Sequence, residues 1–353
     1  MGRGRVRITD IAKELGVSAS TVSRALSNGG RICDETKKKV IELANKWGYK
    51  PNPFAISLLK KQSKTIGLIL PEFTHHYFTK VLSGVNQVVN EEGYHLFIVT
   101  HEGSLEKEQN AAAMLSSMHV DGIIASYARG TTDFEHYLDL LEDDVPVVFL
   151  DRSCEDLDTS YVITDDFPGC IESIDHLVKS GNTRIIHISG PDNLSTSFTR
   201  MTGYKEGLRK NGLTVNEKYI LNSEDREWKK RFKTLVLSDE VEAVHCFNDY
   251  VAYEVIQELK KLNKIIPEDI SVIGFADEPV ATYMSPQLST VMQPAEEMGR
   301  RAAEILIGHI RNPDSDQLYC EQLPTNLILR ESTRQIRKKE NLKSVVKVLK
   351  STG

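Results

Sequence analysis

The sequence predicts an α/β protein with a small all-α head and a larger, two-lobed doubly wound core. In residues 9–26, apolar side chains recur at helical spacing on both sides of Gly16, which predicts two short helices joined by a tight turn. From Thr65 onward, apolar runs alternate with helical patterns, as in parallel sheets covered on both faces. Residues 1–64 hold 14 Lys and Arg against five acidic residues, whereas the whole chain carries a net charge of −6. A basic head on an acidic body is typical of a nucleic-acid-binding protein with a second domain.

Size and composition favour a multidomain cytoplasmic protein. The chain has 353 residues, more than one compact domain usually holds. No apolar run approaches the ~20 residues of a membrane span, and the start MGRGRVRITD lacks the apolar segment of a signal peptide. The five cysteines are scattered without a CxxC pair, so we expect buried apolar residues in a reducing compartment. We expect no contact with membranes.

The head, residues 1–50, is predicted to be a helix-turn-helix domain. The apolar residues of 11–15 share one helical face, and Gly16 ends that helix because glycine tolerates φ > 0. Ser18 stands where the second helix needs an N-cap, and the apolar face resumes within residues 22–26. Another interpretation is a helical hairpin buried in a larger core, which the small polar outer face and the basic flanks disfavour.

The outer face of the second helix holds the candidate DNA contacts. Arg24 suits either a guanine edge or a phosphate, and both are common uses of arginine. A third helix is expected over residues 34–47, with Cys33 at its N-cap, so that Asp34 takes over the capping or the cap is weak. The candidate contacts of the head are Ser18, Ala19, Ser20, Thr21, Ser23, Arg24 and Asn28.

Residues 51–64 are the expected hinge helix or linker. Asn52 can cap a helix, and Pro53 suits the first helical position. A helix over residues 53–59 would have barely two turns and could not be stable alone. From these residues by themselves, an ordinary linker with a chance leucine at position 58 is the favoured interpretation.

The core, residues 65–333, is predicted to hold two successive α/β runs and no enzymatic centre. Two similar runs predict two lobes with a ligand cleft at the carboxyl ends of the strands, where polar residues suit a hydroxyl-rich ligand. The sequence lacks GxSxG, HExxH, GxGxxG and P-loop patterns, and the adjacent His75 and His76 have no partner cluster. We therefore expect no catalytic residue, no metal and no cofactor. The strands of the first run are expected at 65–70, 94–100, 121–126 and 145–150.

An ordered set of motifs along the chain resembles the LacI/GalR family of bacterial transcription regulators. The resemblance covers roughly residues 8–333 and is specific because the motifs occur together and in order. They read TDIAKELGVSASTVSRAL, ETKKKV, GYKPN, VDGIIAS, PVVFLDR, ISGP, RMTGY, FND, PEDISVIGF and LSTVMQ.

The resemblance implies a periplasmic-binding-protein-like core in which the chain crosses three times between the lobes. The crossings are expected near 164, 291 and 322. Lobe 1 would then hold about 65–164 and 292–322, and lobe 2 about 165–291 and 323–333.

The resemblance also assigns roles on DNA. Ala19 and Ser20 match the positions that choose the base sequence. In the family, the hinge folds when two copies meet on DNA, and a leucine wedges into the minor groove. Leu58 matches that leucine, with Ala55 beside it and Asn52 at the start of the hinge.

Matching the family motifs residue by residue gives candidate effector contacts at the strand ends. Arg200 is the strongest, since a buried arginine needs an anionic or polyhydroxylated partner. Each of the others also has a structural explanation: Asp151 as a helix cap, Trp228 as core, Tyr77 as packing. The full set is Tyr77, Phe78, Ser126, Asp151, Arg200, Trp228, Asn248, Asp277 and Gln293.

One departure from the family concerns the motif GFADEP at residues 274–279. The first acidic residue of the family pattern, a ligand contact in sugar-binding relatives, is replaced by Ala276, whereas Asp277 is retained. This replacement removes a carboxylate, and Arg200, Arg152 and His75 are expected nearby. The resulting charge balance favours a sugar acid, a phosphorylated sugar or a purine-like ligand over a plain neutral hexose.

Together these features predict a sequence-specific DNA-binding transcriptional regulator, a repressor controlled by a small sugar-like effector (a sugar, sugar acid or sugar phosphate). Its partners would be a near-palindromic double-stranded DNA operator, the effector, and a second copy in a homodimer. Residues 334–353 are expected to form a frayed basic tail, or else a helix that pairs dimers into tetramers. The alternative is a cytosolic solute-binding or sugar-metabolising protein on the same α/β scaffold.

Overall fold

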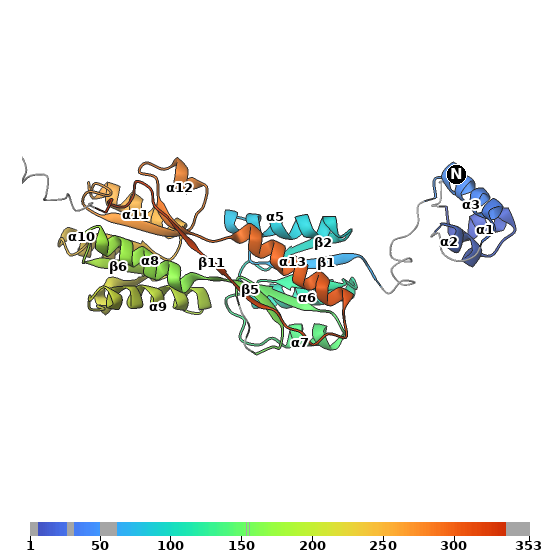
Figure 1. Cartoon of the computed structure of the whole chain (residues 1–353), viewed down its shortest axis with the longest axis horizontal. Helices are drawn as coiled ribbons and strands as arrows, with labels where there is room; N and C mark the ends of the chain where they lie inside the picture. Colours follow the sequence, from blue (N-terminus) through green and yellow to red (C-terminus); the bar gives the residue numbers. More distant parts are fainter. Residues whose placement is uncertain (1–5, 27–31, 50–61, 153, 155, 337–353) are drawn as a thin grey trace, which may run out of the picture. The chain divides into compact units, whose positions relative to one another are not determined.

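A computed structural model describes residues 6–26, 32–49, 62–152, 154 and 156–336 (Figure 1). The chain divides into two units, residues 1–64 and residues 65–353. Among the described residues, no helix has both the length and the apolar character needed to cross a bilayer. The predicted contacts Asn28, Asn52, Ala55 and Leu58 lie outside the described residues, as do most of the expected hinge and tail.

The described residues of the head form three helices: α1 (Ile8–Leu15), α2 (Ala19–Leu26) and α3 (Asp34–Trp47). Gly16 and Gly48 end α1 and α3 in the left-handed conformation, with φ of 64° and 67°. The Ser18 hydroxyl accepts a hydrogen bond from the Thr21 N–H at 3.1 Å, which confirms the expected N-cap of α2. Cys33 caps α3 without a side-chain hydrogen bond. The buried core of the head is Ile11, Ala12, Val22, Ala25, Val40 and Ala44.

Lobe 1 is built on a six-stranded parallel sheet of order β11-β5-β4-β3-β1-β2. Strand order reverses between β1 and β3, so the sheet is doubly wound, and a crevice opens at the carboxyl ends of these strands. Its strands are β1 (Thr65–Leu70), β2 (His95–Thr100), β3 (Gly122–Ala125), β4 (Val147–Leu150), β5 (Ser160–Asp165) and β11 (Cys320–Pro324). Its helices are α5 (His76–Glu91), α6 (Leu105–Ser117), α7 (Glu135–Glu142) and α13 (Ala295–Arg311).

Lobe 2 repeats this plan in a second sheet of order β12-β10-β9-β8-β6-β7, in which only β12 is antiparallel. Its strands are β6 (Ile185–Ser189), β7 (Ile220–Asn222), β8 (Ala243–Cys246), β9 (Ser271–Ala276), β10 (Ser289–Met292) and β12 (Asn326–Ile328). Its helices are α8 (Asp166–Lys179), α9 (Ser195–Lys210), the 3-10 turn η1 (Glu217–Tyr219), α10 (Trp228–Leu237), α11 (Asp249–Lys261) and α12 (Val280–Tyr283).

The chain passes between the two sheets three times, after β5, after β10 and after β11. The third passage follows Pro324 rather than residue 322, because Leu323 and Pro324 still pair with Thr164 and Asp165 of β5. Lobe 2 also extends past residue 333. The Arg334 guanidinium donates hydrogen bonds to three backbone carbonyls, among them that of Glu268 at 2.7 Å, so the expected tail starts later.

The cysteines divide into two groups. Cys154, Cys170 and Cys246 are buried, as expected. Cys33 and Cys320 are exposed, so the expectation of burial was wrong for these two. Cys33 stands at the N-cap of a surface helix and Cys320 starts β11 at the edge of its sheet, two places where solvent reaches the side chain.

Helices α5 and α13 lie side by side and touch backbone to backbone through two glycines (Figure 1). A Cβ added at Gly84 would lie 1.9 Å from the Glu296 carbonyl oxygen, and one at Gly299 would lie 2.1 Å from the Val81 carbonyl oxygen. No side chain can enter at either position unless the helices separate. This contact therefore fixes α13, which arrives from lobe 2, rigidly onto lobe 1.

We expect Gly299→Ala to destabilise the core by about 1–3 kcal/mol, because the added methyl group meets backbone that cannot move aside alone. Gly308→Ala is the matched control: it lies on the same helix with no atom within 4 Å of its added Cβ, and should stabilise by up to about 1 kcal/mol. Urea unfolding of the two variants measures both effects. Equal stability of the two variants would contradict the close packing.

Candidate effector cavity and DNA-binding head

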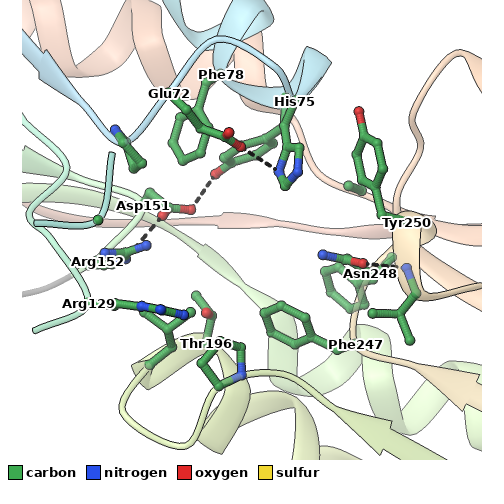
Figure 2. Close-up of a pocket in the computed structure, with 18 of the residues that line it drawn as sticks. Glu72, His75, Phe78, Arg129, Asp151, Arg152, Thr196, Phe247, Asn248 and Tyr250 are labelled. Atoms are coloured by element: carbon green, nitrogen blue, oxygen red, sulfur yellow. Dashed lines mark hydrogen bonds and ion pairs between the residues drawn. The ribbon is translucent and has the colours of Figure 1, made fainter. Parts of the chain in front are cut away.

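A cavity of about 460 Å³ lies between the lobes, at the carboxyl ends of the strands of both sheets (Figure 2). Its walls come from the loops that follow β1 to β4 in lobe 1 and β6 to β9 in lobe 2. Parallel strands bring these loops to one edge of each sheet, and the three passages of the chain bring the two edges together. The cavity is therefore built by the topology and not by one local motif.

Six of the nine predicted effector contacts line the cavity: Tyr77, Phe78, Asp151, Arg200, Asn248 and Gln293. Ser126, Trp228 and Asp277 lie outside its lining. Trp228 is buried in the apolar core of lobe 2 with Phe232, which is the packing role. Asp277 turns away and accepts a hydrogen bond from Arg330 Nη2 at 2.6 Å. Ser126 is fully buried at the end of β3.

Arg200 is buried and its charge is balanced by Asp166. Its Nε and Nη2 atoms lie 2.8 and 2.7 Å from Asp166 Oδ2, and Nη1 donates to the Phe247 carbonyl at 2.7 Å. The guanidinium carbon lies 3.8 Å from the centroid of the Phe275 ring. Burial raises the pKa of Asp166, and Arg200 acts against that shift. Arg200 thus presents an oriented, neutralised guanidinium to the cavity.

A second polar group joins Tyr77, Asp151 and Arg152. The Tyr77 hydroxyl donates to Asp151 Oδ1 at 2.8 Å, and Arg152 Nε lies 3.5 Å from Asp151 Oδ2. Burial raises the pKa of Tyr77 well above its usual value, and the Asp151 carboxylate adds to this, so the phenol stays a proton donor. Asp151 has φ of 68° and Ala276 has φ of 120°, so strained backbone occurs at two points of the lining.

Several lining residues were not predicted. Glu278 is the most important, because it supplies a carboxylate to the cavity two residues after Ala276, whereas Asp277 does not line it. The only sequence signal for Glu278 was the acidic pair that follows Ala276. Arg152 and His75 had been expected nearby and do line the cavity. The other unpredicted lining residues that Figure 2 labels are Glu72, Arg129, Thr196, Phe247 and Tyr250.

In the head, considered by itself, α2 exposes Ser20 and Arg24 one helical turn apart. Ser18 is also exposed, and its hydroxyl lies 2.7 Å from that of Ser20. Thr21 and Ser23 are half-buried, so they reach the surface at the sides of this face. Ala19 is half-buried and packs against the apolar core of the head, so less of its methyl group is accessible to a DNA base.

Within the described part of the chain, no three His, Cys, Asp or Glu residues are grouped as they would be around a metal ion. What the two units hold is a helix-turn-helix head with a small polar face and a two-lobed core with a polar cavity. These features define a DNA-binding transcriptional regulator with an effector-binding core.

Comparison with known proteins gives the family. Residues 7–52 match the family described as bacterial regulatory proteins, lacI family, and residues 174–333 match the periplasmic binding protein-like domain. The chain is 33% identical over 329 residues to the ribose operon repressor of Bacillus subtilis (strain 168), covering 93% of this chain and 98% of that protein. The chain belongs to the LacI family of bacterial transcription regulators.

Other relatives agree with this. Identity is 30% over 332 residues to the HTH-type transcriptional repressor PurR of Vibrio vulnificus (strain CMCP6), covering 93% of this chain and 99% of that protein. The solved complex of the transcriptional regulator CelR with cellobiose is 26% identical with a TM-score of 0.69, covering 93% of this chain and all of that one. The lac repressor dimer bound to operator, 22% identical with a TM-score of 0.78, shares the fold over 94% of this chain. These relatives are regulators, not enzymes.

Arg200→Ala should destabilise the core by about 3–5 kcal/mol, because it leaves the buried Asp166 carboxylate unpaired. Adding Asp166→Asn should recover part of this loss, which urea unfolding of the two single variants and the double variant measures. Lys205→Ala is the control on the same helix: its exposed pair with Glu217 should cost less than about 1 kcal/mol. Additive single effects would show that Arg200 and Asp166 do not act as a pair.

Proposed function

We propose that the protein is a cytoplasmic repressor whose affinity for its operator is set by a neutral, hydroxyl-rich effector bound between the lobes. A single head with one short recognition helix binds weakly, because sequence-independent attraction to phosphate supplies much of its affinity. Two heads on a near-palindromic site supply the rest, so the active species is a homodimer. The effector changes the affinity for DNA through the core, and DNA changes the affinity for the effector by the same factor.

The charge pairing in the cavity carries the proposal about the effector. Each arginine of the lining already has a carboxylate partner: Arg129 pairs with Glu224, Arg152 with Asp151, and Arg200 with Asp166. A phosphate or carboxylate ligand would have to compete for these cations, and at Arg152 or Arg200 it would leave a buried acid without its partner. The sequence argument for an anionic ligand, which began from Ala276, is therefore not favoured by the charges around it.

The rest of the lining suits hydroxyl groups. Carboxylate oxygens of Glu72 and Asp151 accept from hydroxyl donors, and the Phe78 and Phe247 side chains offer apolar contacts for C–H faces. Figure 2 shows these side chains turned toward a common space. Two similar solved structures are complexes with neutral sugars, one of CelR with cellobiose and one of a protein from Alkaliphilus metalliredigens with D-xylulofuranose.

We expect Arg24→Ala to weaken binding to the specific operator by about 5- to 150-fold, because a lost arginine contact to a base edge is worth about 1–3 kcal/mol. Lys46→Ala on α3 removes the same charge from another helix of the head and should have a smaller effect. Mobility shifts with operator and scrambled duplexes, at two salt concentrations, measure both. If Arg24→Ala binds the operator as wild type does, α2 is not the recognition helix.

A thermal-shift screen tests the effector class. Neutral pentoses, hexoses and disaccharides are compared with uronic acids and sugar phosphates at equal concentration. We expect stabilisation from a neutral sugar, of about 2.7 kcal/mol at 100 times its dissociation constant. The same sugar should change operator affinity in the mobility-shift assay. Stabilisation by the phosphorylated or acidic sugars alone would contradict the neutral-ligand proposal and leave the regulator assignment intact.

A further inference from the structure

At one edge of the cavity, a carboxylate from lobe 2 binds the first turn of a helix in lobe 1. Glu278 follows β9 in lobe 2 and is only 4% exposed. Its Oε1 accepts a hydrogen bond from the Tyr77 N–H at 3.1 Å, and its Oε2 accepts one from the His76 N–H at 3.2 Å. These N–H groups begin α5. Glu278 therefore acts as a helix cap that the opposite lobe supplies.

The capping is needed because α5 has no cap of its own. The first N–H groups of a helix have no acceptor within the helix, and the helix dipole favours a negative charge beside them. His75, the N-cap residue, makes no capping hydrogen bond with its side chain, and the first turn of α5 contains no acidic residue. Separation of the lobes would leave these donors and the carboxylate to water.

Lobe 2 holds Glu278 in place for this contact. The Glu278 N–H donates to Asp249 Oδ2 at 2.7 Å, and the Thr290 hydroxyl donates to Asp249 Oδ1 at 2.6 Å. A Cβ on Gly274 would lie 2.1 Å from Asp249 Oδ1, so only glycine lets the carboxylate sit against β9. Burial raises the pKa of Asp249 to about 6, and the hydrogen bonds from Thr290 and Glu278 act against that shift.

A second contact supports the same edge. The rings of His75 in lobe 1 and Tyr250 in lobe 2 stack with centroids 4.3 Å apart and an interplanar angle of 20° (Figure 2). The Tyr250 hydroxyl lies 3.4 Å from the Thr74 carbonyl oxygen and 3.5 Å from Glu278 Oε2. The interlobe pair of Arg129 and Glu224, by contrast, is about half exposed, and such pairs contribute little.

We propose that Glu278 is an interlobe latch, a cap for α5 that links the lobes across the effector cavity and sets how far the arrangement in which the two lobes make this contact is populated before an effector binds. An effector shifts the lobe equilibrium only by its differential affinity for the two arrangements. Because the latch consists of the chain's own residues, it changes the ratio of the two arrangements in the protein without effector. Its regulatory meaning rests on the proposed function, whereas the contact itself can be tested without DNA or effector.

Hydrogen exchange of the His76 and Tyr77 amides in the full-length protein, with no effector added, measures directly whether Glu278 protects these two N–H groups. In Glu278→Ala these two amides should exchange at least about tenfold faster, as expected for loss of a hydrogen bond to a charged group. Glu278→Gln should fall between, because an amide oxygen accepts without the charge. Amides later in α5 must stay slow, which shows that the helix is still folded. Unchanged exchange at His76 and Tyr77 in both variants would overturn the proposal.

Pulsed electron paramagnetic resonance tests whether the cap also links the lobes. Nitroxides are placed at Thr79 on α5 and Gln257 on α11, with the exposed Cys33 and Cys320 replaced by serine and labelled chains diluted with unlabelled ones. Glu278→Ala should broaden the distance distribution or lengthen it. Glu254→Ala is the matched control, since Glu254 also lies on lobe 2 and its exposed pair with Lys229 stays within that lobe. Identical distributions in all variants would reduce Glu278 to a local cap and overturn the latch.

Discussion

The buried Asp166 carboxylate lies at the point where the chain first passes from lobe 1 to lobe 2. It accepts hydrogen bonds from Arg200 and from the Thr164 hydroxyl at 2.7 Å, and the Gln293 amide lies 3.4 Å away. Gln293 belongs to the second passage and also bonds Thr164 at 2.9 Å. A charge buried this deeply is tolerated only when its partners satisfy it, so these residues must keep their geometry as a group. Two of the three passages are therefore fixed to one charge.

The third passage joins the same region. The Thr325 hydroxyl donates to the Asp165 carbonyl at 3.1 Å, and a Cβ on Gly169 would lie 2.4 Å from the Thr325 hydroxyl oxygen. All three connections thus meet around the start of α8. Arg200 both binds Asp166 and lines the cavity, so one side chain joins the cavity to the region where the three connections meet.

Sequence patterns were informative where structure is local. Helical spacing with Gly16 and Ser18 gave the head, and apolar runs gave the central strands, because these signals arise within one segment. The sequence analysis missed β5 and every element after β9, namely α12, β10, α13, β11 and β12. Strand β11, for example, is short and half polar and is defined by pairing with a strand about 160 residues earlier. Glu278 was missed for a similar reason, since its partners lie about 200 residues away in another lobe. Trp228 was predicted as an effector contact but packs in the core of lobe 2. An aromatic residue on an amphipathic helix gives the same sequence pattern in either place, so the pattern alone could not decide between them.

The connectivity of the chain links the cavity to the point where the core begins. Strand β1 begins at Thr65, where the core begins, so the segment that leads from the head enters lobe 1 directly. Within lobe 1, α5 and α13 touch through Gly84 and Gly299 and cannot slide past each other without a clash. The N-terminal turn of α5 faces the cavity and is held by lobe 2. Under the proposed function, a change in the angle between the lobes would act on this turn of α5, and α5 and α13 would follow it together.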